Sequence, residues 1–272
     1  MKNQPINTID DVIRFLDYII TESEKNNDTL GYFAALYQRV TLKVKEGIQT
    51  SYFEDGPRME KLDVIFAKKY IDAWVAWKGN EKTSESWKKA FSFSTKYWPV
   101  VLQHLLIGMN AHINFDLGAA AAEISKNQNI EDLKNDFNRI NEILSSLVNE
   151  VQNNLSTIWP ALKRILVKTG KADNILADFS MEVARDGAWE FAKKLSALSH
   201  NERTGVIKSR DEKVALISKI ITRPKPWLKI ILWVVRVGEL GSVSEKIKKP
   251  LNLNFPQMNL PIIFENNEIF KS

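Results

Sequence analysis

The chain contains no cysteine, and only three of its 272 residues are histidines. The absence of cysteine excludes disulfide bonds, thiolate metal sites, iron–sulfur clusters and a cysteine nucleophile. Three histidines, His104, His112 and His200, are too few for a histidine-rich metal centre. The first residues lack the apolar segment of a signal peptide, so we expect a cytoplasmic protein.

The common sequence motifs of catalysis are also missing. The chain has no glycine-rich phosphate loop, no GxGxxG dinucleotide motif, no GxSxG nucleophile motif and no HExxH zinc motif. It has no recognisable nucleic-acid-binding module either, so we expect no nucleic acid among its partners. The function must therefore be inferred from less specific features.

Apolar residues recur with helical spacing along almost the whole chain, and no segment alternates with the period of a strand. With 44% apolar and 26% charged residues, the composition is that of a globular protein. We predict one all-α domain over residues 1–272, a bundle of about nine or ten helices with an extended tail at 250–272. Capping residues, prolines and glycines place helices near residues 8–22, 28–48, 57–78, 99–124, 130–154, 157–168, 172–199, 209–222 and 226–238, and a further helix that begins at Ser84 or Ser86.

The segment 99–124 has the pattern of a helix buried at the centre of the bundle. Nineteen residues between Lys96 and Asp116 carry no formal charge, yet the segment is too polar to span a membrane. His112 and Asp116 are four residues apart, so their side chains should meet on one face. This spacing suits an imidazole oriented by a carboxylate, or two ligands of one metal. Asn110 and Asn114 lie on a nearly opposite stripe and must also find partners, so a purely structural polar network is the alternative.

Asp63 is the second polar residue that points in an unexpected direction. In the predicted helix 57–78 it falls in the sector of Phe66, Tyr70 and Trp74. A carboxylate there is costly unless a cation, a metal or several donors meet it, and otherwise its pKa should rise. The structural alternative is a buried aspartate that caps a helix or pairs with an arginine.

We expect Asp63, His112 and Asp116 to share one polar cluster, because buried acids are too costly to be scattered independently through a core. Two acids beside the ring should raise the pKa of His112, unless a bound metal keeps the imidazole neutral.

Three segments, YFAALYQRVTLKV, FEDGPRMEKLDVIFAKKYIDA and LLIGMNAHINFDLGAAAAE, resemble a family of bacterial proteins of unknown function. The resemblance covers residues 32–124. It implies an all-helical cytoplasmic protein and brings no established activity or cofactor. It draws attention to Tyr37, Arg39, Thr41, Asp55, Arg58, Asp63, Tyr70, Asn110, His112, Asn114 and Asp116.

Positive charge is concentrated near the carboxyl end. Residues 202–249 contain twelve lysines and arginines against five acids. Together with Trp227 and Trp233, this basic stretch could face nucleic acid or an anionic membrane. The alternative is that these cations solvate the outer faces of ordinary helices.

The leading hypothesis is an enzyme that acts on a small molecule in an apolar pocket between helices, with His112, Asp116 and Asp63 as its catalytic residues. In one version it is a hydrolase with a divalent metal held by these three residues, and the shortage of histidine favours Mg²⁺ or Mn²⁺ over Zn²⁺. The alternatives are a non-enzymatic binding protein for an apolar ligand, and a membrane-surface or partner-interaction protein that uses residues 202–249. The residues expected to contact the small molecule are Tyr70, Asn110, Asn114, Tyr37 and Arg58.

Overall fold

Helices make up the regular structure of the computed structural model, which describes residues 5–140, 142–144, 181–239 and 241–248. Within these residues there are ten α-helices and no strand, which confirms the all-α prediction. The predicted helix 157–168 and the tail 250–272 lie outside the described residues. The elements are α1 (Ile9–Asn26), α2 (Gly31–Gln49), α3 (Gly56–Lys78), α4 (Glu85–Ser94), α5 (Val101–Ala111), a π-helical segment (His112–Leu117), α6 (Gly118–Ile124), a 3-10 helix (Ile130–Leu133), α10 (Met181–Ser196), α11 (His200–Thr222), α12 (Pro226–Gly238) and α13 (Val243–Lys248).

Local capping signals set the starts of the first helices. The Thr8 side chain accepts a hydrogen bond from the backbone N–H of Asp11, and the Asp11 carboxylate accepts one from the backbone N–H of Thr8. This capping box begins α1. Asp55 accepts from the backbone N–H of Arg58 at 2.9 Å, and Pro57 occupies the first turn of α3.

Helix α11 begins earlier than the sequence pattern indicated, at His200 instead of near residue 209. The backbone N–H of Ser199 donates to the carboxylate of Glu202 at 3.0 Å. A serine followed three residues later by a glutamate is a capping signal. This signal was present in the sequence, and the weak apolar periodicity of the first turns of α11 concealed it.

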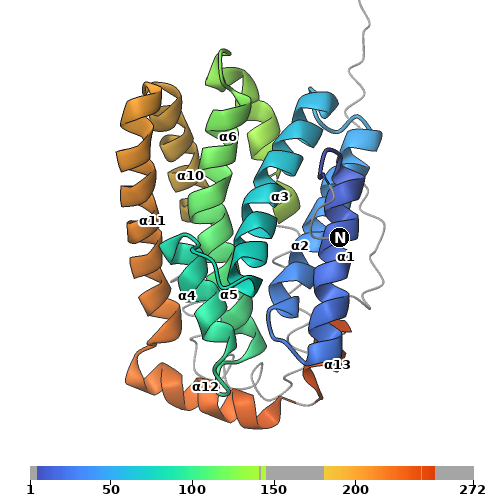
Figure 1. Ribbon diagram of the computed structural model, residues 1–272, viewed down its shortest axis with the longest axis vertical. Coiled ribbons are helices and arrows are strands. Elements are labelled where there is room, and N and C mark those ends of the chain that lie inside the picture. Colours follow the sequence, from blue (N-terminus) through green and yellow to red (C-terminus); the bar gives the residue numbers. More distant parts are fainter. Residues whose placement is uncertain (1–4, 141, 145–180, 240, 249–272) are drawn as a thin grey trace, which may run out of the picture.

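The segment 101–124 is the central rod of the bundle (Figure 1). It contacts α2 and α3 on one side and α10 and α11 on the other, with α4 against its lower half. Helix α12 crosses the lower end of the bundle, roughly perpendicular to the other long helices. Within the described residues, none of the helices combines the length and the apolar character needed to cross a bilayer.

The central rod is not one uniform α-helix, because His112–Leu117 forms a π-helical turn. A π-turn shifts hydrogen bonds to the fifth residue along the chain and widens the helix. Arg210 of α11 donates from Nε to the backbone carbonyl of Asn114 at 2.8 Å, which gives a partner to a carbonyl inside the widened turn. Gly118 follows the turn and lies directly against the backbone of Ala188 in α10.

We expect Gly118→Ala to destabilise the fold, because an added Cβ would lie 2.5 Å from the carbonyl oxygen of Ala188. Overpacking of this kind lowers the free energy of unfolding by about 1–3 kcal/mol, measurable by urea denaturation. Gly205→Ala in α11 is the control, since nothing lies within 4 Å of its added Cβ. The control should gain about 0.5–1 kcal/mol from helix propensity. An unchanged stability of Gly118→Ala would contradict the close approach of α6 and α10.

Candidate functional site

His112 and Asp116 form a buried pair within the π-turn. The imidazole Nδ1 lies 2.9 Å from Oδ2 of Asp116, and both side chains are only 3% exposed. The indole Nε1–H of Trp87, from α4, donates to the same carboxylate oxygen at 2.8 Å. Because the carboxylate accepts, Nδ1 carries the proton of the neutral ring, and Nε2 is left with a lone pair.

Aromatic rings from three helices enclose this imidazole. The ring of Phe66 stacks on His112 with centroids 3.6 Å apart and planes at 6°. The ring of Tyr37 meets it edge-on at 4.5 Å. The rings of Phe33, Tyr70 and Trp87 complete the enclosure at centroid distances up to 6.0 Å. We call these five residues, Phe33, Tyr37, Phe66, Tyr70 and Trp87, the aromatic cage.

Burial in this cage lowers the pKa of His112 below its ordinary value of 6.5. The hydrogen bond and the charge of Asp116 act in the opposite direction but do not outweigh the loss of solvation. Our expectation of a raised pKa was therefore wrong. The cause is that the cage removes water from the ring more completely than one carboxylate can compensate.

Asp63 lies on α3 one turn before Phe66 and is buried. Its Oδ2 atom finds no hydrogen-bond partner in the part of the chain that the structure describes. Burial, and to a smaller extent the charge of Glu60, raises the pKa of Asp63 to about 8. At neutral pH this carboxyl group is therefore mostly protonated and is a hydrogen-bond donor.

Tyr37, on α2, is the third buried titratable group beside the His112–Asp116 pair. Its hydroxyl is buried and makes no hydrogen bond of regular geometry with the described residues, although the nearby side chain of Thr41 acts to lower its pKa. Burial raises the pKa of Tyr37 well above 10, and the charges of Asp63 and Asp116 raise it further. Tyr37 thus lies within electrostatic range of both acids while its ring contacts His112.

The three-ligand metal set that we considered does not form. No group of three histidine, cysteine, aspartate or glutamate side chains within residues 5–140, 142–144, 181–239 and 241–248 could hold a metal ion. His112 and Asp116 form a hydrogen-bonded pair, whereas the relation of Asp63 to them is limited to the effect of its charge on the pKa of Tyr37. The pair is therefore better suited to proton transfer than to metal binding.

Asn110 and Asn114 face away from the aromatic cage, towards α11. The Asn110 amide donates to the backbone carbonyl of Val214 and to the Ser218 hydroxyl, both at 3.0 Å. Asn114 in turn donates to Oδ1 of Asn110 at 3.0 Å. These hydrogen bonds form the structural polar network that we considered as the alternative, and they join the central rod to α11.

Arg58, in the first turn of α3, forms an ion pair with Asp136. Its guanidinium lies 3.1 Å from the fully buried carboxylate of Asp136. Asp136 also accepts from the backbone N–H groups of Glu54 and Asp55. Arg58 therefore fixes the loop before α3, two turns or more from the ring of Phe66, and is not among the residues that contact His112.

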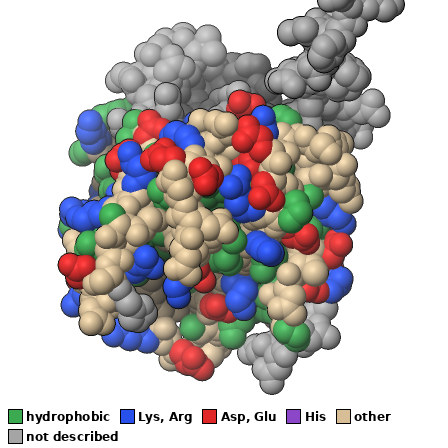
Figure 2. All heavy atoms as spheres, turned by 90° about the horizontal axis from the view of Figure 1, so that it is seen from above, with side chains coloured by type: hydrophobic (Ala, Val, Ile, Leu, Met, Phe, Trp, Pro, Cys, Tyr) green, Lys and Arg blue, Asp and Glu red, His purple; other side chains and the backbone are tan. Residues whose placement is uncertain are grey.

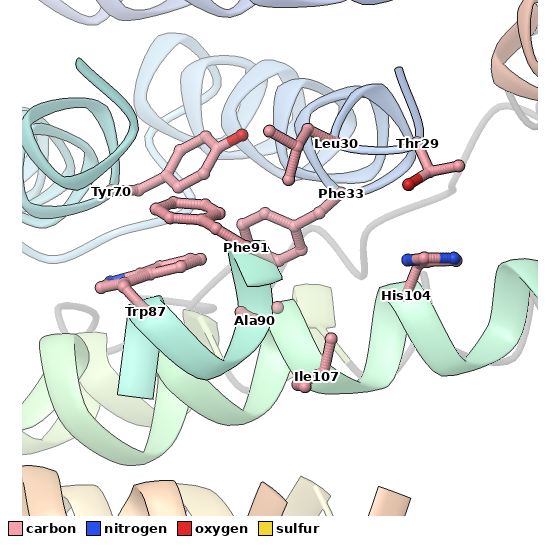
Figure 3. Close-up of a pocket in the computed structure, with 10 residues that line it drawn as sticks. Thr29, Leu30, Phe33, Tyr70, Trp87, Ala90, Phe91, His104 and Ile107 are labelled. Carbon is pink, nitrogen blue, oxygen red and sulfur yellow. The ribbon is translucent and has the colours of Figure 1, made fainter. Parts of the chain in front are cut away.

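A cavity of about 20 Å³ borders the aromatic cage, which is room for about one water molecule. Figure 3 shows the rings of Phe33, Tyr70, Phe91 and Trp87 gathered at one end of its lining, with His104 at the other. Burial, followed by the charge of Arg236, lowers the pKa of His104 to about 4. Phe33, Tyr70 and Trp87 line both this cavity and the space around His112.

Sequence reasoning did not identify Trp87 and the residue that positions it. Asp211 of α11 accepts from the backbone N–H groups of Glu85 and Ser86, at 2.7 and 2.9 Å, and so caps α4. Trp87 follows directly. A buried tryptophan on the apolar face of a short helix must find an acceptor for its indole N–H. This requirement could have indicated from the sequence that Trp87 lies beside a buried acid.

Residues 9–224 match a family of unknown function, DUF5995. The chain belongs to this family. The match runs from α1 to just beyond α11, so the DUF5995 region contains the His112–Asp116 pair, the aromatic cage and the residues of α11 that support them. Helices α12 and α13 lie beyond it. No curated protein and no solved structure matches the chain. Membership in DUF5995 therefore supports the resemblance found in residues 32–124 and assigns no reaction.

We expect Asp63→Asn to change how stability depends on pH. The ordinary pKa of 3.8 applies in the unfolded chain, and the folded value is about 8. The folded protein therefore binds one more proton between these values, and this stabilisation is lost as pH rises from about 4 to about 8, by a few kcal/mol in order of magnitude. Urea denaturation along this pH range should show a smaller loss for Asp63→Asn than for the wild type.

The matched control for this measurement is Asp72→Asn, which changes an exposed aspartate on the same helix. It should follow the wild-type pH dependence. If Asp63→Asn also follows it, the buried carboxyl group does not titrate as stated.

We expect the His112 ring to remain neutral down to a pH below 6.5, with its proton on Nδ1. Nitrogen-15 NMR of the imidazole reports both the tautomer and the midpoint. Asp116→Asn removes the charge that favours the imidazolium, so the midpoint should move further down. A wild-type midpoint above 6.5 would instead indicate a stable imidazolium–carboxylate pair.

Proposed function

We propose that this protein is an enzyme that acts on a small apolar molecule and that His112 is its general base. The observation that carries the proposal is the buried Nε2 of His112, which has no partner among the described residues although Nδ1 is held by Asp116. Buried polar atoms normally find hydrogen-bond partners. A water molecule or a substrate hydroxyl would provide the partner here.

The pair has the properties that proton transfer requires. A lowered pKa keeps His112 in its basic form at neutral pH, and it makes the imidazolium a sufficiently strong acid to return the proton. Asp116 fixes the orientation of the ring and would stabilise the imidazolium as it forms. The indole N–H of Trp87 holds the carboxylate in place.

Two protonated groups complement this base. Asp63 and Tyr37 both have raised pKa values and buried oxygen atoms that make no hydrogen bond of regular geometry in the described part of the chain. They would donate hydrogen bonds to a substrate oxygen on which negative charge develops, in surroundings where water does not compete. Hydrolysis is the reaction that results when the base activates water.

The aromatic cage sets the class of substrate. Its rings offer apolar contacts on every side of the imidazole, with no cationic group among them. A small uncharged molecule fits these surroundings better than a phosphate or a carboxylate does. It would enlarge the cavity of about 20 Å³ by displacing rings that line both the cavity and the cage.

The test compares the wild type with His112→Gln in a bacterial small-molecule extract analysed by mass spectrometry. We expect the wild type to consume at least one compound. His112→Gln should still bind this compound but should consume it about 10²- to 10⁴-fold more slowly. His200→Gln, a change at the first residue of α11, is the control and should keep the wild-type rate. Trp87→Phe retains an aromatic ring but removes the donor to Asp116, and it should lower the rate more mildly.

The pH profile gives an independent measure. The rate should rise as His112 loses its proton below pH 6.5 and fall as Asp63 loses its proton near pH 8. Equal consumption by His112→Gln would overturn the role of the base. A compound that binds to all variants and is never consumed would identify a binding protein instead.

A further inference from the structure

Helix α12 exposes an apolar face to solvent. Ile230, Trp233 and Val237 are 66%, 56% and 65% exposed, and Val234 is also exposed. These residues are spaced by three, four and seven, so they form one stripe along the helix. Val235 points the other way and is buried. The outward face of α12 is therefore apolar where a surface helix ordinarily carries polar residues.

Positive charge borders this stripe. Lys225 and Lys229 are exposed and lie four residues apart, so they share one edge of α12; Arg236 lies further along this edge and pairs with Glu239. From residue 213 to residue 238 the sequence contains six lysines and arginines and no acidic residue. An apolar helix face with cations along its edge is the pattern of a helix that lies in the interface of an anionic membrane.

The loop before α5 extends the same surface. Tyr97 and Trp98 are 75% and 60% exposed. A groove of about 520 Å³ separates this loop from α12, and Lys96 and Lys229 are among the residues that line it. Tryptophan and tyrosine favour the boundary between lipid and water, because one end of each side chain is apolar and the other is polar. Most of the remaining lining is apolar: Phe93, Pro99, Pro224, Leu232 and Trp233.

The surface is held firmly to the bundle. Arg236 donates to the backbone carbonyl of Tyr97 at 3.0 Å and pairs with Glu239 at 3.1 Å. Glu239 also accepts from the backbone N–H of Val101 at 2.9 Å and pairs with Lys246. These contacts fix α12 relative to α5 and to the loop before it.

The position of α12 suits a flat partner. The helix lies across one end of the bundle, so its outward face can lie parallel to a plane (Figure 1). Among the side chains coloured by type in Figure 2, which views the opposite end, acidic and basic groups are interspersed and no comparable apolar stripe is visible. A helix of 13 residues is only about 20 Å long, too short to span a bilayer.

We propose that α12, together with Tyr97 and Trp98, docks this protein on the surface of a membrane that contains anionic phospholipid. The apolar stripe enters the boundary between headgroups and acyl chains, and the lysines meet lipid phosphates. The groove beside Lys96 and Lys229 receives part of one lipid. This inference is independent of the proposed catalysis, because none of its residues belongs to the aromatic cage.

The test is sedimentation of the full chain with vesicles of phosphatidylcholine and phosphatidylglycerol, compared with vesicles of phosphatidylcholine alone. We expect binding to the anionic vesicles at low salt, and at least about tenfold weaker binding at high salt, because salt screens the contribution of each lysine. Lys225→Glu/Lys229→Glu should abolish binding. Lys61→Glu/Lys126→Glu changes the net charge equally at exposed positions outside α12 and should retain it.

The apolar contribution has its own pair of variants. Ile230→Gln/Val237→Gln should lower binding at least about tenfold. In the wild type, both exposed apolar side chains move from water into the membrane on binding, and this favourable transfer is lost in the variant. Leu42→Gln alters an exposed apolar side chain on α2 and should bind as the wild type does. Lipids brominated on their acyl chains should quench tryptophan fluorescence in the wild type, and this quenching should weaken in Trp98→Phe/Trp233→Phe.

Failure of the full chain to sediment with anionic vesicles at low salt would overturn the proposal. Equal binding by the wild type and Ile230→Gln/Val237→Gln would also overturn it. So would a concentration-dependent dimer that Ile230→Gln/Val237→Gln dissociates, because a second copy would then cover the stripe. His112→Gln should bind vesicles as the wild type does, so failure of the catalytic proposal would leave this result unchanged.

Discussion

The carboxylate of Asp116, buried in the middle of the central rod, is the constraint to which the surrounding structure responds. A carboxylate in an apolar interior needs donors, and here Trp87 and His112 supply them at 2.8 and 2.9 Å. These two hydrogen bonds place α4 against the rod and fix the imidazole at one angle. The hydrogen bond to the Asp116 carboxylate thus sets the orientation of the His112 ring. It also sets the direction in which the Nε2 atom of His112 points.

Helix α11 supports both sides of this arrangement through two consecutive residues. Arg210 donates to the backbone carbonyl of Asn114 within the π-turn, and Asp211 caps the start of α4 just before Trp87. About one to three turns further along, Val214, Ser218 and Ile221 of the same helix accept hydrogen bonds from the side-chain amides of Asn110 and Gln103. The long contact between α11 and the rod thus holds the widened turn in place within the core.

Burial is the dominant influence on the titratable groups of the site. It lowers the pKa of His112 and raises the pKa values of Asp63 and Tyr37, so all three are uncharged at neutral pH. An uncharged imidazole can accept a proton from a substrate, and the carboxylate of Asp116 beside it then balances the charge of the imidazolium. The apolar surroundings that make the site costly to build are therefore also what give its groups their useful protonation states.

The sequence by itself determined the features that depend on neighbouring residues. Helical periodicity and caps such as Thr8 with Asp11 gave the all-α class and most helix limits, and a spacing of four placed His112 and Asp116 on one face. Tertiary structure decided what depends on contacts between distant segments. The π-turn, the indole of Trp87 as a partner of Asp116, the turn of Asn110 towards α11 and the lowered pKa of His112 all arise from packing between helices. Periodicity shows which face of a helix is buried, but the neighbouring helices alone determine which groups that face meets and how much water they exclude.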